Sequence, residues 1–366
     1  MRWFEQFASN STAGSGNQLI FSAKEKRTGR VYYKITVGGT FVYSLLFSNI
    51  LDSTYADGSL AHKNLICEPW HIEEAKVSRC AALDWHGEER VDLPAPIGET
   101  VLTFGGKAQK TVAPGEFFTT DEVELTFEAG EFLCLEMTYS GEVLPYHEES
   151  LLPIFVKQDG VWTFDKHMPL PGMIGVKRNV KARVGFFGDS ITQGIGTVQN
   201  SYEHWNAKVA QKLGGEYAFW NLGIGYGRAN DAATDGAWMY KAKHNDAVVV
   251  CFGVNDILQG KKEEQIKSDL MEITRTLRKA GVKVLVQTVP PFDYEGEKIG
   301  IWQRVNQFIF DTVAKEADGI FDAAAVLAMS AEQPHRAKYG GHPDAQGCTV
   351  WADALAPVLK DLLENK

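Results

Sequence analysis

The sequence of 366 residues has few cysteines, no long apolar run and no apolar leader at its N-terminus. Its five cysteines are scattered, without a CxxC pair or metal-ligand spacing, so we expect reduced, buried thiols and no metal centre. No apolar stretch approaches the roughly 20 residues of a membrane-spanning helix. These absences favour a cytoplasmic protein, unless a leader precedes the sequence given.

Basic residues are too few and too dispersed for a nucleic-acid surface. The chain has 37 Lys and Arg against 47 Asp and Glu, a formal net charge of -10, and no long basic run. We therefore expect no nucleic-acid partner and no anionic membrane surface, whereas a small ester or a neutral polysaccharide suits this charge. Hydrophobic residues at 44% indicate a globular protein, and the length predicts two domains. The oligomeric state stays open.

The first half of the chain alternates apolar and polar residues. This period of two is typical of half-buried antiparallel strands, and turns such as Gly38-Gly39 and Gly105-Gly106 separate them. Many such strands at close spacing predict a jelly-roll-like β-sandwich over residues 1–175. The alternating apolar positions include Val31, Tyr33, Ile35 and Val37, then Val123, Leu125 and Phe127, and then Leu133, Leu135, Met137 and Tyr139.

The pattern changes after the Pro- and Gly-containing stretch 168–173. Short apolar strands now alternate with helices, one of which has apolar residues at Ile266, Leu270, Ile273 and Leu277. This order predicts a flavodoxin-like, three-layer α/β domain over residues 176–366, with a parallel sheet and a site beyond the carboxyl ends of its strands. The expected strands are 184–187, 217–222, 247–252, 282–289 and 319–322.

Four polar segments follow strands or precede the last helix of this domain. In Gly188-Asp189-Ser190, the serine hydroxyl is exposed where a strand runs into a helix, which suits a nucleophile. Three glycines in 223–227 allow a backbone amide to approach a ligand, and Asn255 can donate its side-chain amide to the same oxygen. His342, in a loop, can take and return a proton near neutral pH. Taken singly, these residues also fit a helix cap, a tight turn and an exposed histidine.

Together, in this order, the four segments resemble the SGNH/GDSL hydrolases, and the resemblance covers about residues 182–366. It implies a carboxylic ester hydrolase with Ser190 as nucleophile and His342 as base, acting without metal or cofactor. It also implies oxyanion donors from the Ser190 amide, an amide among Gly225, Tyr226 and Gly227, and Asn255. The first half resembles, through segments 41–49 and 102–106, the sandwich that precedes the hydrolase domain in a bacterial subgroup, and similar sandwiches accompany two-domain carbohydrate acetyl esterases.

Two positions depart from the family pattern. Tyr339 stands where the family has an aspartate that orients the histidine, and the expected oxyanion glycine falls on Tyr226. Three substitutes for the aspartate stay open: a backbone carbonyl that accepts from His342 Nδ1, Asp344 turned inward, or a carboxylate from elsewhere. We interpret Asp189 as support for its turn. Neither Cys251 nor Cys348 has an adjacent histidine that would make a thiolate.

The substrate is less determined than the reaction. The sandwich, and aromatic rings at Trp205, Trp220 and Trp238, favour short acyl esters, acetyl above all, on carbohydrates, although each tryptophan also fits a core position. A lipase-like esterase or acyltransferase for longer chains is one alternative. A carbohydrate-binding protein with a decayed hydrolase domain is another. His147 is a candidate contribution from the sandwich to the site, with a surface position as the simpler expectation.

Overall fold

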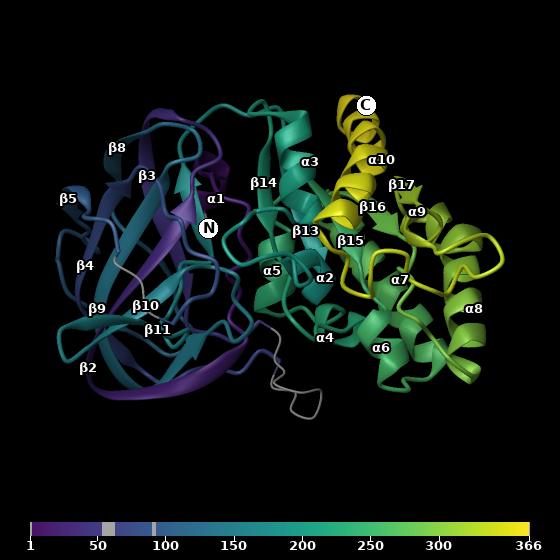
Figure 1. Ribbon diagram of the computed structural model, residues 1–366, viewed down its shortest axis with the longest axis horizontal. Helices are drawn as coiled ribbons and strands as arrows, with labels where there is room; N and C mark the ends of the chain where they lie inside the picture. The colour runs from purple at the N-terminus through teal and green to yellow at the C-terminus, as the bar shows by residue number, and fades with distance from the viewer. Residues whose placement is uncertain (1, 53–62, 90–92, 366) are drawn as a thin grey trace.

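The computed structural model describes residues 2–52, 63–89 and 93–365. A β-rich N-terminal domain and an α/β C-terminal domain lie side by side (Figure 1). The C-terminal helix lies on the α/β domain, and the short N-terminal helix α1 (Trp3–Gln6) lies near the seam between the two domains. The predicted fold class, a β-sandwich followed by a parallel α/β domain, is confirmed.

The N-terminal domain is a sandwich of two antiparallel sheets. Alternation decides which side chains enter it: Leu133, Leu135, Met137 and Tyr139 of one strand are all fully buried in the core between the sheets. One sheet has the order β1 (Ala8–Ser9), β12 (Met173–Val176), β3 (Gly39–Ser48) and β7 (Phe117–Thr119), with β8 (Val123–Phe127) also on β3. The other has the order β11 (Val161–Phe164), β10 (Ile154–Gln158), β2 (Leu19–Lys34), β9 (Phe132–Tyr146), β4 (Trp70–Cys80) and β5 (Ile97–Val101), with β6 (Lys110–Val112) on β4.

The C-terminal domain has a five-stranded parallel sheet with the strand order 2-1-3-4-5 in chain sequence, which is the flavodoxin-like order. All five expected strands form, each shifted by a residue or two at its ends. Their residues are almost completely buried, as expected for a sheet covered by helices on both faces. From one edge to the other the strands are β14 (Ala218–Asn221), β13 (Arg183–Gly188), β15 (Ala247–Cys251), β16 (Lys283–Gln287) and β17 (Gly319–Phe321).

Helices cover this sheet with the apolar stripes that the sequence predicts. Ile266, Leu270, Ile273 and Leu277 face the core from α7 (Glu263–Lys279), which has acidic residues in its first turn and basic residues in its last. Trp351 of α10 (Ala345–Glu364) stacks on Trp205 of α3 (Trp205–Leu213), with ring centroids 4.8 Å apart. The remaining helices are α2 (Ser190–Gln193), α4 (Ala229–Ala232), α5 (Ala237–Ala242), α6 (Val254–Leu258), α8 (Glu297–Asp311), the 3₁₀ turn Val313–Lys315 and α9 (Ala323–Leu327).

The chain passes from one domain to the other over residues 177–182. The stretch 168–173 leads into β12, which pairs with β3 and β1 and ends at Val176, and β13 begins only at Arg183. A domain boundary between residues 175 and 176 therefore falls inside a strand of the sandwich. The Pro- and Gly-containing composition of residues 168–173 is typical of a linker. The strand β12 forms because it pairs with β3, which lies far away in sequence, so composition alone does not predict it.

The two domains are joined by buried polar contacts as well as by apolar packing. Lys241 of α5 forms an ion pair with Asp52 at 2.6 Å, and both side chains are almost fully buried. The indole nitrogen of Trp220 donates to the carbonyl oxygen of Gly172 at 2.7 Å. His204 Nε2 lies 3.0 Å from the carbonyl oxygen of Thr12. The sandwich and the α/β domain therefore form one continuous body.

Candidate active site

Ser190 follows the carboxyl end of strand β13, the second strand of the parallel sheet, as the first residue of α2. Asp189 caps this helix, because its Oδ1 accepts a hydrogen bond from the Ile191 amide at 3.0 Å. A Cβ at Gly188 would overlap Oγ1 of Thr192 and lie 2.6 Å from the carbonyl oxygen of Cys251, so only glycine fits the tight turn. The turn thus fixes where the Ser190 side chain, 7% exposed, projects.

His342 brings its ring to this serine from the loop before α10. Its Nε2 lies 2.8 Å from Ser190 Oγ, although 152 residues separate the two in sequence. Phe292 packs edge-to-face on the imidazole, with ring centroids 5.2 Å apart. Burial lowers the pKa of His342 because a desolvated imidazolium is unfavourable. The neutral ring, which can accept the serine proton, is therefore the form present near neutral pH.

Within the described part of the chain, Ser190 supplies the one hydrogen bond that reaches the His342 ring. Asp344 Oδ1 instead accepts from the Gly347 amide at 2.8 Å and so caps α10. This corrects the alternative in which Asp344 turns inward to orient the histidine. Tyr339 contributes its carbonyl oxygen to the Asp344 amide, at 3.1 Å, which shapes the same loop. Among the residues that the structure describes, the geometry is that of a Ser–His pair without a carboxylate partner.

The loop of residues 224–228 follows β14, and its Ile224 amide donates to the carbonyl oxygen of Gly188, two residues before the serine, at 3.1 Å. Its Gly227 amide donates to the carbonyl oxygen of Ile224 at 3.1 Å, so this amide is already engaged. That corrects the inclusion of Gly227 among the oxyanion donors and leaves the amides of Gly225 and Tyr226 as candidates. Tyr226 has a φ of 57°, in the left-handed region that favours glycine. The loop that bonds to the nucleophile turn therefore holds a non-glycine residue in a strained conformation.

Asn255 reaches this loop from the first turn of α6. Its Nδ2 donates to the carbonyl oxygen of Gly227 at 3.0 Å, and the side chain is 9% exposed. Because an amide nitrogen carries two hydrogens, one stays available for an oxygen in the site. Asp256, the next residue, accepts from the Ala229 amide at 2.9 Å. Burial raises the pKa of Asp189 to about 7 and that of Asp256 to about 6.

Several other predicted candidates lie elsewhere. His147 is 1% exposed and burial lowers its pKa to about 4, so the expected surface position is wrong. Trp205, Trp220 and Trp238 are core residues and form no platform for a sugar ring. All five cysteines are free and buried, and burial raises the pKa of Cys251 and of Cys348, which disfavours a thiolate at either position.

Sequence reasoning missed two residues of the sandwich that touch the site. Gln18 Nε2 donates to the carbonyl oxygen of Gly225 at 3.2 Å, across 207 positions of sequence. Glu149 lies next to Gln18, since its amide donates to Gln18 Oε1 at 3.3 Å. No local pattern marks either residue, because the contact depends on how the two domains pack.

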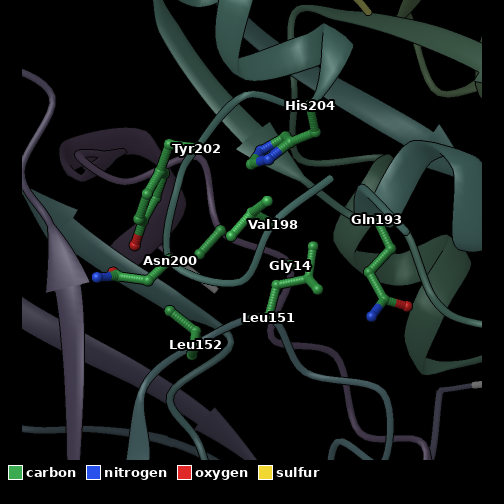
Figure 2. A pocket seen from close by; sticks show the side chains of 9 residues that line it. Gly14, Leu151, Leu152, Gln193, Val198, Asn200, Tyr202 and His204 are labelled. Carbon is green, nitrogen blue, oxygen red and sulfur yellow. The ribbon is translucent and has the colours of Figure 1, made fainter. Parts of the chain in front are cut away.

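A separate, narrow pocket lies between the domains (Figure 2). Its wall includes Gln193, the last residue of α2, but neither Ser190 nor His342; the other lining residues are Ala13, Gly14, Leu151, Leu152, Val198, Asn200, Tyr202 and His204. Within residues 2–52, 63–89 and 93–365, no group of three or more His, Cys, Asp or Glu side chains is placed to hold a metal ion. None of the described helices is long and apolar enough to cross a bilayer.

A doubly wound parallel sheet with a buried Ser–His pair at its carboxyl edge is suited to a serine hydrolase of flavodoxin-like fold. Residues 186–350 match the model of the GDSL-like Lipase/Acylhydrolase family. The α/β domain belongs to this family, and the chain is a carboxylic ester hydrolase. No curated protein sequence matches the chain.

Among solved structures, the chain is similar to a family two carbohydrate esterase from Cellvibrio japonicus, with 11% identity and a TM-score of 0.39, over 98% of this chain and 97% of that one. It is also similar to the acetyl xylan esterase AlAXEase, at 22% identity and a TM-score of 0.39, over 48% and 98%. The esterase EstA from Pseudoalteromonas sp. is similar at 15% identity and a TM-score of 0.39, over 50% and 98%.

Proposed function

We propose that the protein hydrolyses short-chain acyl esters, acetyl esters above all, through an acyl-enzyme on Ser190. The observation that carries this proposal is the 2.8 Å contact between Ser190 Oγ and His342 Nε2. His342 takes the hydroxyl proton as Oγ attacks the ester carbonyl carbon, and returns it to the departing alcohol. A water molecule, deprotonated by the same ring, then releases the acid and restores the serine.

Negative charge develops on the carbonyl oxygen in both steps. The proposed donors to this oxygen are the Ser190 amide, an amide of Gly225 or Tyr226, and the second N–H of Asn255. Asn255 is neutral over the working pH range, so it stabilises the charge without taking a proton. Its hydrogen bond to Gly227 also fixes its direction. One donor position therefore lies in the 224–228 loop, and another lies on the helix turn that contacts this loop.

A small acyl group suits the site better than a long one. Ser190 is 7% exposed, and a long chain needs an open apolar groove beside the nucleophile. The apolar pocket between the domains has neither catalytic candidate in its wall. With the three tryptophans in the core, the resemblance of the sandwich to those of carbohydrate acetyl esterases is the support for a sugar as the alcohol part. An acetylated saccharide is the proposed substrate.

The proposed nucleophile is tested with p-nitrophenyl acetate and a fluorophosphonate. Wild-type protein should hydrolyse the ester and take up one equivalent of label, whereas Ser190→Ala should do neither. Ser201→Ala removes a serine hydroxyl that donates to the Val198 carbonyl, outside the site, and serves as the control. Hydrolysis by Ser190→Ala would contradict the assignment. Failure of the wild type to label would favour a decayed hydrolase domain.

Chain-length profiling tests the acyl preference. Rates on acetyl, butyryl and octanoyl p-nitrophenyl esters should fall steeply with length, and acetate should be released from acetylated xylo-oligosaccharides. A rise towards octanoyl would favour the lipase-like alternative. Transfer of the acyl group to added alcohol in preference to water would favour the acyltransferase.

A further inference from the structure

The sandwich domain contacts the candidate oxyanion loop through Gln18 and Glu149. Gln18 is fully buried, accepts from the Glu149 amide through Oε1 and donates from Nε2 to Gly225 O. The carbonyl oxygen of Glu149 accepts from Nε2 of Gln193, at 2.5 Å, at the end of the helix that begins with Ser190. One small cluster of the first domain therefore holds both the loop and the nucleophile helix of the second.

Gly225 is the point of closest approach between the domains at this loop. Its φ lies outside the left-handed region, so the backbone conformation itself does not require glycine. A Cβ at this position, however, would overlap Oε2 of Glu149 and lie 3.0 Å from Nε2 of Gln18. Oε2 of Glu149 is buried and accepts no hydrogen bond from the described residues. The glycine thus makes room for a side chain of the other domain.

On its other side the loop is held by its own domain. Asn255 donates to Gly227 O, and Tyr226, between the two held residues, has the strained φ of 57°. A strained conformation persists only where its surroundings fix it. The loop is therefore fixed from both sides, by Gln18 and Glu149 at Gly225 and by Asn255 at Gly227.

We propose that Gln18 and Glu149 are positioning residues for ester hydrolysis, and that they hold the Gly225–Tyr226 backbone where its amides face the Ser190 oxyanion. This inference rests on the proposed function. It makes the sandwich a structural part of the active site, beyond any role in binding a saccharide. Neither side chain needs to touch substrate. Gln18 acts on the transition state through the loop, so loss of its side chain lowers kcat and leaves KM nearly unchanged. Glu149 acts through its backbone amide and carbonyl oxygen, which hold Gln18 and Gln193 and remain when its side chain is shortened.

A double-mutant cycle on the Gly225–Glu149 contact tests the proposal. Gly225→Ala should lower kcat on p-nitrophenyl acetate by about 10²-fold, as for the loss of one oxyanion donor, because the new methyl group displaces the loop. Adding Glu149→Ala makes room for the methyl group and should restore most of the lost kcat. A double variant as slow as Gly225→Ala alone would overturn the proposal.

Gln18 is tested with a near-isosteric apolar replacement. Gln18→Met removes the hydrogen bond to Gly225 O while filling similar volume, and kcat should fall about 10-fold or more with KM unchanged, since small misplacements of catalytic groups are costly. Wild-type kcat in Gln18→Met would also overturn the proposal. Glu149→Gln, which keeps the shape of the side chain, should retain activity, and its failure to do so would count against a positioning role.

Two controls separate this inference from its alternatives. Asn64→Ala removes two hydrogen bonds between the domains. One joins Asn64 to the amide of Ala237, the first residue of α5, and the other joins it to Thr234 in the segment before α5. Asn64→Ala should leave kcat unchanged. A decrease in kcat equal to that of Gln18→Met would mean that any weakening of the domain interface lowers kcat. All variants should still take up one equivalent of fluorophosphonate, although more slowly. If wild-type protein fails to take up the label, the proposed function is wrong. If wild-type protein is labelled but Gln18→Met and Gly225→Ala have the kcat of wild type, only the positioning role is wrong.

Discussion

Asn255 Nδ2 lies 3.0 Å from the carbonyl oxygen of Gly227, so a side chain that follows one strand fixes the loop that follows another. Replacing it should therefore remove a donor and release the loop. Asn255→Ala should lower kcat on p-nitrophenyl acetate by about 10²–10³-fold. Asn255→Asp should be at least as slow, because a carboxylate would face the Gly227 oxygen and the developing negative charge. Unchanged urea-unfolding midpoints would show that the loss is catalytic, and an unchanged kcat in Asn255→Ala would remove Asn255 from the mechanism.

The pH dependence of hydrolysis should report His342. Burial lowers its pKa from the ordinary value of 6.5, and only the neutral ring can accept the serine proton. As the pH falls through this lowered pKa, kcat/KM should decrease with the uptake of one proton, so the midpoint of the acid limb should lie below 6.5. A midpoint above 6.5 would mean that a negative charge stabilises the imidazolium, which the described surroundings of the ring do not supply.

Asp344 distinguishes a Ser–His pair from a triad. Its carboxylate caps α10 through the Gly347 amide, and asparagine is an equally good helix cap. Asp344→Asn should therefore keep both stability and kcat close to wild type. In a triad, the corresponding exchange typically lowers kcat by about 10⁴-fold. Steady-state rates on p-nitrophenyl acetate decide between the two, and a loss of that size would restore Asp344 as the orienting acid.

The sequence predicted those parts of the molecule that depend on local pattern. The five strands of the parallel sheet are short apolar runs, and the candidate residues Ser190 and Asn255 stand where such runs end. A parallel sheet gathers the carboxyl ends of its strands at one edge, so residues distant in sequence were expected together. That rule brings together the segments of Ser190 and Asn255, whereas the approach of His342, from the loop before α10, was expected from the family resemblance.

The remaining features depend on contacts between domains, which leave no periodic signal. Gln18 and Glu149 reach the site only because the sandwich packs on the loop at Gly225. His147 is buried for the same reason. The Gly227 amide, predicted as a possible donor, is turned to Ile224 by the strained backbone at Tyr226. The conformation of such a turn depends on the residues packed around it. Three glycines are compatible with several conformations, so the sequence does not show which amide of the loop faces the site.

Breaking the buried ion pair between Lys241 and Asp52 should destabilise the protein. Both side chains are at most 3% exposed, and Asp52 also accepts from the Asn17 amide at 2.9 Å. Lys241→Met leaves a buried carboxylate without its counter-charge and should lower the free energy of unfolding by about 3–5 kcal/mol, as measured with urea. Adding Asp52→Asn removes that charge but keeps an acceptor for Asn17, and should recover part of the loss. Additive losses in the double variant would show that the pair is not coupled.

His204 should make the fold sensitive to acid. It is buried, its Nε2 bonds to the Thr12 carbonyl, and burial lowers its pKa to about 4. In the unfolded chain the His204 ring becomes protonated near its ordinary pKa of 6.5, whereas in the folded protein it stays neutral down to about pH 4. The contribution of His204 is therefore fully present above pH 6.5 and is lost as the pH falls, at up to about 1.4 kcal/mol per pH unit.

His204→Gln keeps a donor for the Thr12 carbonyl without a titrating group, so its unfolding free energy should fall less steeply than that of wild type between pH 6.5 and 4. Asp189 and Asp256 act in the opposite direction. Their raised pKa values, about 7 and about 6, mean that the folded state binds protons first, so they add stability as the pH falls. Both carboxyls are present in wild type and variant, so the difference between the two urea-unfolding curves isolates His204. Parallel pH dependences would show that its ring is already protonated in the folded protein or lies exposed to solvent.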